Sequence, residues 1–187
     1  MAETHYDLST IRDLVARRLG PQYVQQMQMA PSDPDRFDSY LAVRQELADH
    51  SDSIVLPLTE RLDIVDHEGR PEVRCQCGRL FGDYRENWKL RSAILVRNSA
   101  ELMAEIYGAD HGYDPSLVEF REYVCPGCGW LLDLETLPPG TPVIFEFLPD
   151  LATFYRDWLG REPPLADVSV EDRTEAVLSP WARAADR

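Results

Sequence analysis

Lysine, catalytic sequence motifs and long apolar runs are all scarce in this chain. Lys89 is the single lysine among 187 residues, so a Schiff-base or phosphate-binding lysine has one candidate. The phosphate loop G-x-x-x-x-G-K-[ST], the dinucleotide fingerprint G-x-G-x-x-G, the nucleophile elbow G-x-S-x-G and the zinc-protease motif H-E-x-x-H do not occur. The sequence therefore assembles no nucleophile, base and oxyanion donor, and we expect no catalytic residue in it.

The chain also lacks the features of membrane and nucleic-acid-binding proteins. No apolar run approaches the roughly 20 residues that span a bilayer, and the start Met1-Ala2-Glu3-Thr4 has no basic n-region. We therefore expect a cytoplasmic protein that does not bind membranes. The net charge of -14 opposes free binding to nucleic acid, which depends on neutralising phosphates. Residues 70–97 nevertheless carry seven Arg or Lys against three acidic residues, so a nucleic-acid-binding adaptor is kept as an alternative.

The four cysteines form two short motifs that are typical of a metal site. Cys75-Gln76-Cys77-Gly78 is a C-x-C motif, and Cys125-Pro126-Gly127-Cys128-Gly129 is a C-x-x-C motif. Two such pairs can supply the four ligands that a tetrahedral Zn²⁺ prefers, and a glycine after each pair lets the backbone curl around the ion. About four dozen residues separate the pairs, so the site would join two distant segments of the chain.

Disulfides, buried thiols and redox chemistry are the alternatives for these cysteines. A disulfide between Cys75 and Cys77 would close a strained ring, and nothing points to an oxidising compartment. A redox C-x-x-C would open a helix in a βαβ unit, whereas Cys125 lies between two predicted strands at what resembles a hairpin tip. His67 could in principle replace one cysteine. Because four thiolates leave no position for water, we predict a closed structural zinc site. Its ligands would be Cys75, Cys77, Cys125 and Cys128.

Hydrophobic periodicity predicts an α+β fold, in which N-terminal helices precede a small antiparallel sheet region stapled by the zinc-ribbon-like site. Helices are expected over residues 7–19 and 23–27, and from an Asp33-Pro34 start to Leu47. Short strands are expected at residues 54–56, 62–65, 72–74, 93–97, 118–124, 130–134 and 143–147. A helix capped by Asn98 and Glu101 would follow the fourth strand, and a final helix would run from Pro149 to Gly160.

The pattern divides the chain into an N-terminal helical segment (1–50), a zinc-stapled α+β domain (51–160) and an extended tail (161–187). The first helices have no apolar partner of their own, so we expect them to pack on the β region or on another subunit. The tail has scattered prolines and weak periodicity. It is expected to wrap a neighbour or to be partly disordered, with one helical turn near Val170 to Leu178.

The remaining polar residues are expected at exposed positions. Lys89 is expected to be solvated or at an interface, and the mixed charges Glu119, Arg121 and Glu122 are typical of an exposed strand face. The histidines are scattered through loop-like positions and are expected to be surface side chains: His5, His50, His67 and His111.

Several stretches in a consistent order carry a resemblance to a known family. They are Asp33-Pro34-Asp35-Arg36-Phe37, Ile54-Val55-Leu56-Pro57-Leu58, Val73-Arg74-Cys75-Gln76-Cys77-Gly78, Glu86-Asn87-Trp88-Lys89-Leu90, Arg121-Glu122-Tyr123-Val124-Cys125-Pro126-Gly127-Cys128-Gly129, Pro142-Val143-Ile144 and Phe154-Tyr155-Arg156-Asp157-Trp158-Leu159-Gly160. Together they resemble the small γ subunit of ATP-dependent ketone carboxylases of the acetone carboxylase and acetophenone carboxylase type. The likeness runs from about residue 9 to 164, and the tail beyond about Pro164 departs from the family's shorter members.

The resemblance implies a hetero-oligomeric enzyme that joins a ketone and bicarbonate into a β-keto acid. Its large α and β type subunits would bind ATP and a divalent metal, and they would set which ketone is used. This chain would be the zinc-binding, non-catalytic component that the assembly needs for its integrity. The alternatives are a free-standing zinc-ribbon adaptor, which would bind nucleic acid with a steep salt dependence, and a small zinc or thiol enzyme acting alone, which the all-cysteine ligand set opposes.

Overall fold

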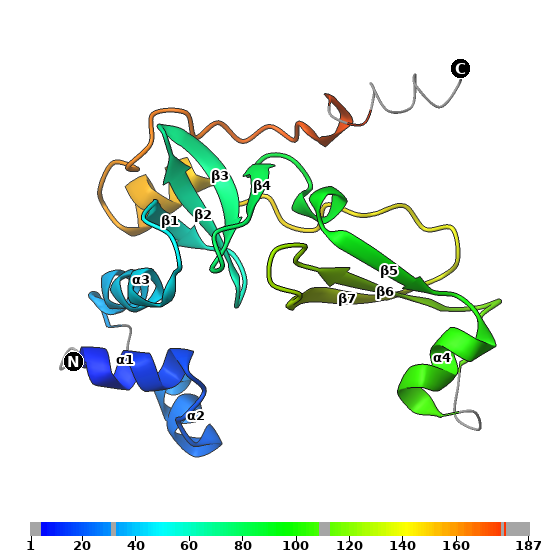
Figure 1. Ribbon diagram of the computed structural model, residues 1–187. Helices are drawn as coiled ribbons and strands as arrows, with labels where there is room; N and C mark the ends of the chain where they lie inside the picture. The colour runs from blue at the N-terminus through cyan, green and yellow to red at the C-terminus, as the bar shows by residue number, and fades with distance from the viewer. Residues whose placement is uncertain (1–4, 31–32, 109–112, 177, 179–187) are drawn as a thin grey trace.

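The computed structural model describes residues 5–30, 33–108, 113–176 and 178. Its elements are helices and two antiparallel sheets, so the α+β prediction is confirmed. Figure 1 shows the sheets next to each other, with the N-terminal helices beside the first sheet and one helix at the outer end of the second. Within the described residues, no helix has the length and apolar character needed to cross a membrane.

The N-terminal helices build a small core of their own before they meet the sheet. They are α1 (Leu8–Val15), α2 (Pro21–Met29) and α3 (Arg36–Leu47). Ile11, Met27 and Val43, one from each helix, are buried against one another. The helices therefore do have an apolar partner among themselves, which the sequence analysis did not foresee. α3 in turn packs on the first sheet.

The start of α3 differs from the prediction. Asp33-Pro34 was expected to supply the cap and the first helical residue, but the helix begins at Arg36 with Asp35 as its N-cap. The buried Asp33 carboxylate instead accepts hydrogen bonds from the backbone N–H groups of Tyr6 and Asp35. It therefore ties the segment before α1 to the start of α3.

The first sheet has four strands in sequence order: β1 (Ser53–Pro57), β2 (Leu62–His67), β3 (Arg70–Cys75) and β4 (Leu80–Asp83). Short β-type runs predicted the first three strands, and β4 was missed because glycine and aspartate make up half of its four residues. β3 and β4 are joined by the turn that contains the first cysteine motif, with Val73 opposite Gly82. The cysteine motif therefore lies at one end of a β-hairpin.

The second sheet has the order β5 (Ala93–Arg97), β6 (Glu119–Val124) and β7 (Leu131–Leu137). The short helix η1 (Trp88–Arg91) leads into it from the first sheet, and α4 (Ala100–Tyr107) connects β5 to β6. α4 is capped by the Ser99 side chain, which accepts from the Leu102 N–H, and not by Asn98 as predicted. The second cysteine motif forms the β6–β7 turn, so it too lies at the end of a hairpin, as predicted.

The strand predicted at residues 143–147 is wrong. This segment has no regular secondary structure, and it pairs with no strand in the described part of the chain. It leads into α5 (Leu151–Thr153), which continues as the π-helical turn η2 (Phe154–Trp158). Leu151 and Tyr155 are buried on the first sheet, where the Tyr155 hydroxyl donates to the Val55 carbonyl at 2.6 Å.

One apolar core joins both sheets, the C-terminal helix and part of the tail. Its buried members are Val55, Leu62, Ile64, Val73, Cys75, Phe81, Tyr84, Trp88, Tyr123, Cys125, Leu151, Tyr155, Leu165 and Val168. The tail therefore packs on the chain's own core over Leu165 to Val168, where the sequence had favoured a neighbour or disorder. Arg85 anchors this stretch through Asp167, at 2.7 Å between Nη1 and Oδ1. Residues 174–176 are helical, within the turn predicted near Val170 to Leu178.

Candidate metal centre

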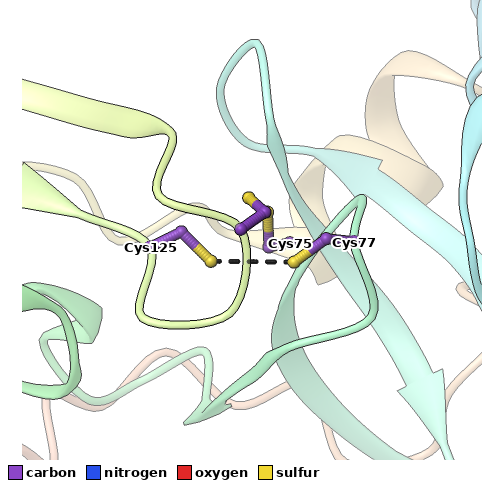
Figure 2. A group of neighbouring side chains, drawn as sticks. Cys75, Cys77 and Cys125 are labelled. Carbon is purple, nitrogen blue, oxygen red and sulfur yellow. Dashed lines mark hydrogen bonds between the residues drawn. The ribbon is translucent and has the colours of Figure 1, made fainter.

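Two hairpin turns bring the four cysteine sulfurs into one group. Cys75 ends β3 and Cys77 follows in the same turn, whereas Cys125 and Cys128 lie in the turn between β6 and β7. The sulfurs all lie within 4.8 Å of one another. Figure 2 shows Cys77 and Cys125 pointing toward each other from the two turns, with Cys75 beside them.

The spacing of these sulfurs fits a tetrahedral metal ion. A Zn–S bond of about 2.3 Å places two sulfurs of a tetrahedron about 3.8 Å apart. The Cys77 and Cys125 sulfurs are 3.7 Å apart, and the Cys75 and Cys128 sulfurs are 4.0 Å apart. A disulfide needs about 2.05 Å, and all four cysteines are free. The group can therefore hold a metal ion, and no disulfide between its members competes with metal binding.

Glycines in the second turn allow its backbone to approach the first. Gly129 has a φ of +73°, in the left-handed region that side chains disfavour, and its N–H donates to the Cys125 carbonyl at 2.9 Å. A Cβ at Gly127 would lie 3.2 Å from the Cys77 sulfur and 3.1 Å from the Arg79 Cβ. Glycine at position 127 therefore lets one turn close over the other.

A contact between side chains also links the two turns. Trp130, directly after the second motif, lies under the Arg61 guanidinium, whose carbon is 3.7 Å from the ring centroid. The same guanidinium donates to the Gln76 side-chain oxygen at 3.0 Å, and Gln76 stands between the two cysteines of the first motif. The contacts of Arg61 with Trp130 and Gln76 therefore fix the two turns relative to each other, in addition to the approach of the four sulfurs.

Burial makes the thiolate forms of Cys75 and Cys77 costly without a cation. Desolvation raises the pKa of the Cys75 thiol, and it also raises the pKa of the Cys77 thiol. At Cys128 burial acts in the same direction, but the Trp130 backbone N–H and the other three thiols outweigh it and lower the pKa of this thiol. A divalent ion would supply the opposite charge that thiolate ligands require.

His67 does not join the group. Its Nδ1 lies 2.7 Å from the Asp52 carboxylate, which also binds Arg74. The structure therefore brings together the four cysteines that the spacing had selected, and it places the histidine alternative elsewhere.

A second polar cluster surrounds Lys89, and no pattern in the sequence had indicated it. The Lys89 side chain is 3% exposed, so the expectation of a solvated lysine is wrong. Its ammonium lies 2.7 Å from Asp133 and 3.2 Å from Glu146, and it also contacts Glu135, which accepts from the Tyr123 hydroxyl. Burial opposes the charge, but hydrogen bonds to these carboxylates raise the pKa of Lys89. The three carboxylates could hold a metal by themselves, but here the ammonium lies among them.

The charges on β6 are also less exposed than expected. Glu119 and Arg121 are buried, and Arg121 Nε donates to the Glu119 carboxylate at 2.7 Å. Arg121 also donates to the Thr141 carbonyl, in the segment that crosses this face of the sheet. The segment after β7 therefore covers a face for which alternating charges had indicated solvent.

Comparisons with known proteins give a consistent result. Residues 48–159, which include both cysteine motifs, match the family model described as acetone carboxylase gamma subunit. A protein named acetone carboxylase gamma subunit, from Xanthobacter autotrophicus, is 42% identical over 161 residues, which is 85% of this chain and 96% of that protein. A protein named acetophenone carboxylase beta subunit, from Aromatoleum aromaticum, is 27% identical over 77 residues, 40% of this chain and 60% of that protein.

Proposed function

The chain belongs to the acetone carboxylase gamma subunit family, and from this membership we propose that it is the zinc-binding, non-catalytic subunit of a hetero-oligomeric ketone carboxylase. Its partners would be large α and β type subunits that bind ATP and a divalent metal. Together they would act as a ligase that joins a ketone and bicarbonate into a β-keto acid. The relatives' names contain two ketones, acetone and acetophenone, and under this proposal the large subunits choose between them.

The observation that carries the proposal is the closed group of four sulfurs at the junction of the two sheets. Four protein ligands fill a tetrahedral zinc site and leave no position for water or substrate, which is the pattern of a structural ion. Cys75 and Cys125 are also members of the core that joins the sheets. Zinc at this point would therefore stabilise the arrangement of the sheets, with Cys75, Cys77, Cys125 and Cys128 as its ligands.

The state of the buried charges supports a non-catalytic role. Arg44, Arg85 and Lys89 are each buried against carboxylates that neutralise them. Charges paired in this way are typical of structural ion-pair networks, which also perturb pKa values. Four free thiols also suit a reducing compartment, and we accordingly propose that the complex works in the cytoplasm.

Purification of the tagged chain from its native cells, with metal analysis of the eluate, tests this function. We expect large carboxylase subunits to co-purify in a fixed ratio, with one zinc ion per copy of this chain. A zinc-loaded chain that elutes alone would favour a free-standing adaptor, and a chain without zinc would refute the metal assignment.

The metal assignment has its own test in Cys128→Ser. Loss of one thiolate should release the zinc and lower the melting temperature, because binding of a structural metal contributes directly to the free energy of folding. Thr136→Ser, at an exposed position of the adjoining strand β7, is the matched control and should change neither. A Cys128→Ser protein that keeps its zinc and its melting temperature would contradict the four-cysteine site.

A further inference from the structure

Away from the metal centre, the surface carries a continuous apolar groove. The groove has a volume of about 480 Å³ and is lined by Leu56, Leu58, Phe147, Phe154 and Trp158, among others. Trp158 is 77% exposed and Phe147 is 59% exposed. A neighbouring hollow shares Phe154 and Trp158 and extends the apolar surface toward α3. Large aromatic side chains gathered and exposed in this way are typical of a protein-binding surface.

The apolar groove ends in an acidic pocket. This pocket, of about 290 Å³, shares Leu58 and Phe147 with the groove and is also lined by Lys89, Asp133 and Glu146. Glu135 binds the same ammonium from the buried side, and Asp150 lines the groove. Four carboxylates against one ammonium leave three negative charges along this surface. The surface is therefore apolar at its centre and negatively charged at its edge.

The backbone along the groove is also open to a partner. Residues 143–148 form no helix or strand, and their N–H groups donate to no backbone carbonyl of the described residues. Asn87 donates to the Val143 carbonyl at 3.3 Å and holds this end of the segment in place. Unpaired backbone N–H groups along a segment can donate hydrogen bonds to the carbonyls of an added chain.

We propose that the apolar groove and the acidic pocket bind a segment of one of the larger carboxylase subunits, whose apolar side chains fill the groove and whose Arg or Lys enters the pocket. This inference rests on the proposed function, and it adds the surface and the chemistry of the contact. The excess negative charge selects a basic partner, because complementary charges steer association and like charges repel. A second copy of this chain would bring the same negative surface, which disfavours self-association here.

Two variants and two matched controls test the surface by binding kinetics. The zinc-loaded full chain is immobilised, and the purified large subunits are supplied in solution at low and high salt. Trp158→Ser removes an exposed aromatic ring from the groove, and Glu146→Gln removes one charge from the pocket. Met29→Ser on α2 and Glu171→Gln on the tail make the same kinds of change at exposed positions outside this surface.

We expect Trp158→Ser to raise the Kd about tenfold or more, mainly by faster dissociation. Glu146→Gln should slow association about threefold at low salt, and the difference should vanish at high salt. Both controls should bind within about twofold of the wild type, and all four variants should keep their zinc and melting temperature. Variants at 158 and 146 that bind like the wild type would overturn the proposed surface. If the variants change self-association of this chain and not its binding to the large subunits, the proposed partner is wrong, and a second copy of this chain occupies the surface. If the wild-type chain itself binds no large subunit, the proposed function fails as well.

Discussion

Replacement of Arg44 by Met tests whether a buried ion pair holds α3 on the first sheet. The Arg44 side chain is 1% exposed and that of its partner Asp63 is 0% exposed. Arg44 donates to one Asp63 oxygen from Nε at 3.0 Å and from Nη2 at 2.6 Å. It also donates to the backbone carbonyls of Glu60 and Leu62, so one side chain joins α3 to the β1–β2 turn and to the start of β2.

The cost of the substitution follows from what it leaves behind. The second Asp63 oxygen has no hydrogen-bond partner among the described residues, so Arg44 is the group that offsets this buried carboxylate. Removing one member of a buried ion pair costs about 3–5 kcal/mol, because the other charge remains desolvated. The free energy of unfolding of a native protein is about 5–15 kcal/mol, so Arg44→Met should leave the folded state only marginally stable. Replacing both partners with apolar residues, as in Arg44→Met with Asp63→Val, should recover at least half of the loss.

Urea unfolding of the chain at pH 7.5, followed by circular dichroism, measures these differences in the free energy of unfolding. Arg12→Met is the matched control, because Arg12 forms a bidentate pair with Glu46 at the surface. Exposed pairs contribute about 0.2–1 kcal/mol, so the control should lose no more than that. An Arg44→Met protein within 1 kcal/mol of the wild type would refute the reasoning. So would a double variant that is no more stable than Arg44→Met alone.

Three further predictions concern buried groups of the same core. Burial raises the pKa of Asp63 from the ordinary 3.8 to about 6, so the folded state binds the Asp63 proton more tightly than the unfolded state. Protonation of Asp63 therefore stabilises the folded state below pH 4, and this contribution is lost as the pH rises through 6. The free energy of unfolding of the wild type, relative to Asp63→Asn, should therefore fall by about 2 kcal/mol between pH 4.5 and 7.5, and a flat difference would contradict the shift. Leu165→Ala should destabilise the chain by about 2–4 kcal/mol in thermal unfolding, because Leu165 is part of the main core. The control Val170→Ala, at an exposed site, should change the stability by no more than about 0.5 kcal/mol. Equal effects would mean that the tail is not held on the core. Lys89→Met should cost about 3 kcal/mol in urea unfolding, and added Glu135→Gln should restore part of it, whereas no recovery would argue against a charge effect.

The grouping of the four cysteines and most of the strands around them could be predicted because their signals are local. Each cysteine pair lies within a few residues of sequence, and apolar runs mark the strand before the first pair and the strands on both sides of the second. The strand predicted at 143–147 shows the limit of such signals. Alternation indicates an extended backbone, but it does not say whether another strand lies beside it.

The buried charges could not be predicted because their partners lie far away in the sequence. Glu135 is 46 residues from Lys89, and Asp167 is 82 residues from Arg85. Charged residues are mostly exposed, because burial of an unpaired charge costs free energy, and only a partner that the fold brings close offsets that cost. Leu165 and Val168 were missed for a related reason, since isolated apolar residues among prolines show no period.

The position of the two hairpins also sets an order of events during synthesis. Cys77 is made 48 residues before Cys125, and at about 5–20 residues per second this interval lasts roughly 2–10 seconds. During that time the first hairpin can present only two thiols, which could hold an ion loosely or become oxidised. Arrival of Cys125 and Cys128 would complete the ligand set and close the intervening chain into a loop. The sulfur group would therefore be incomplete until the second hairpin has been made, whatever ion it then holds.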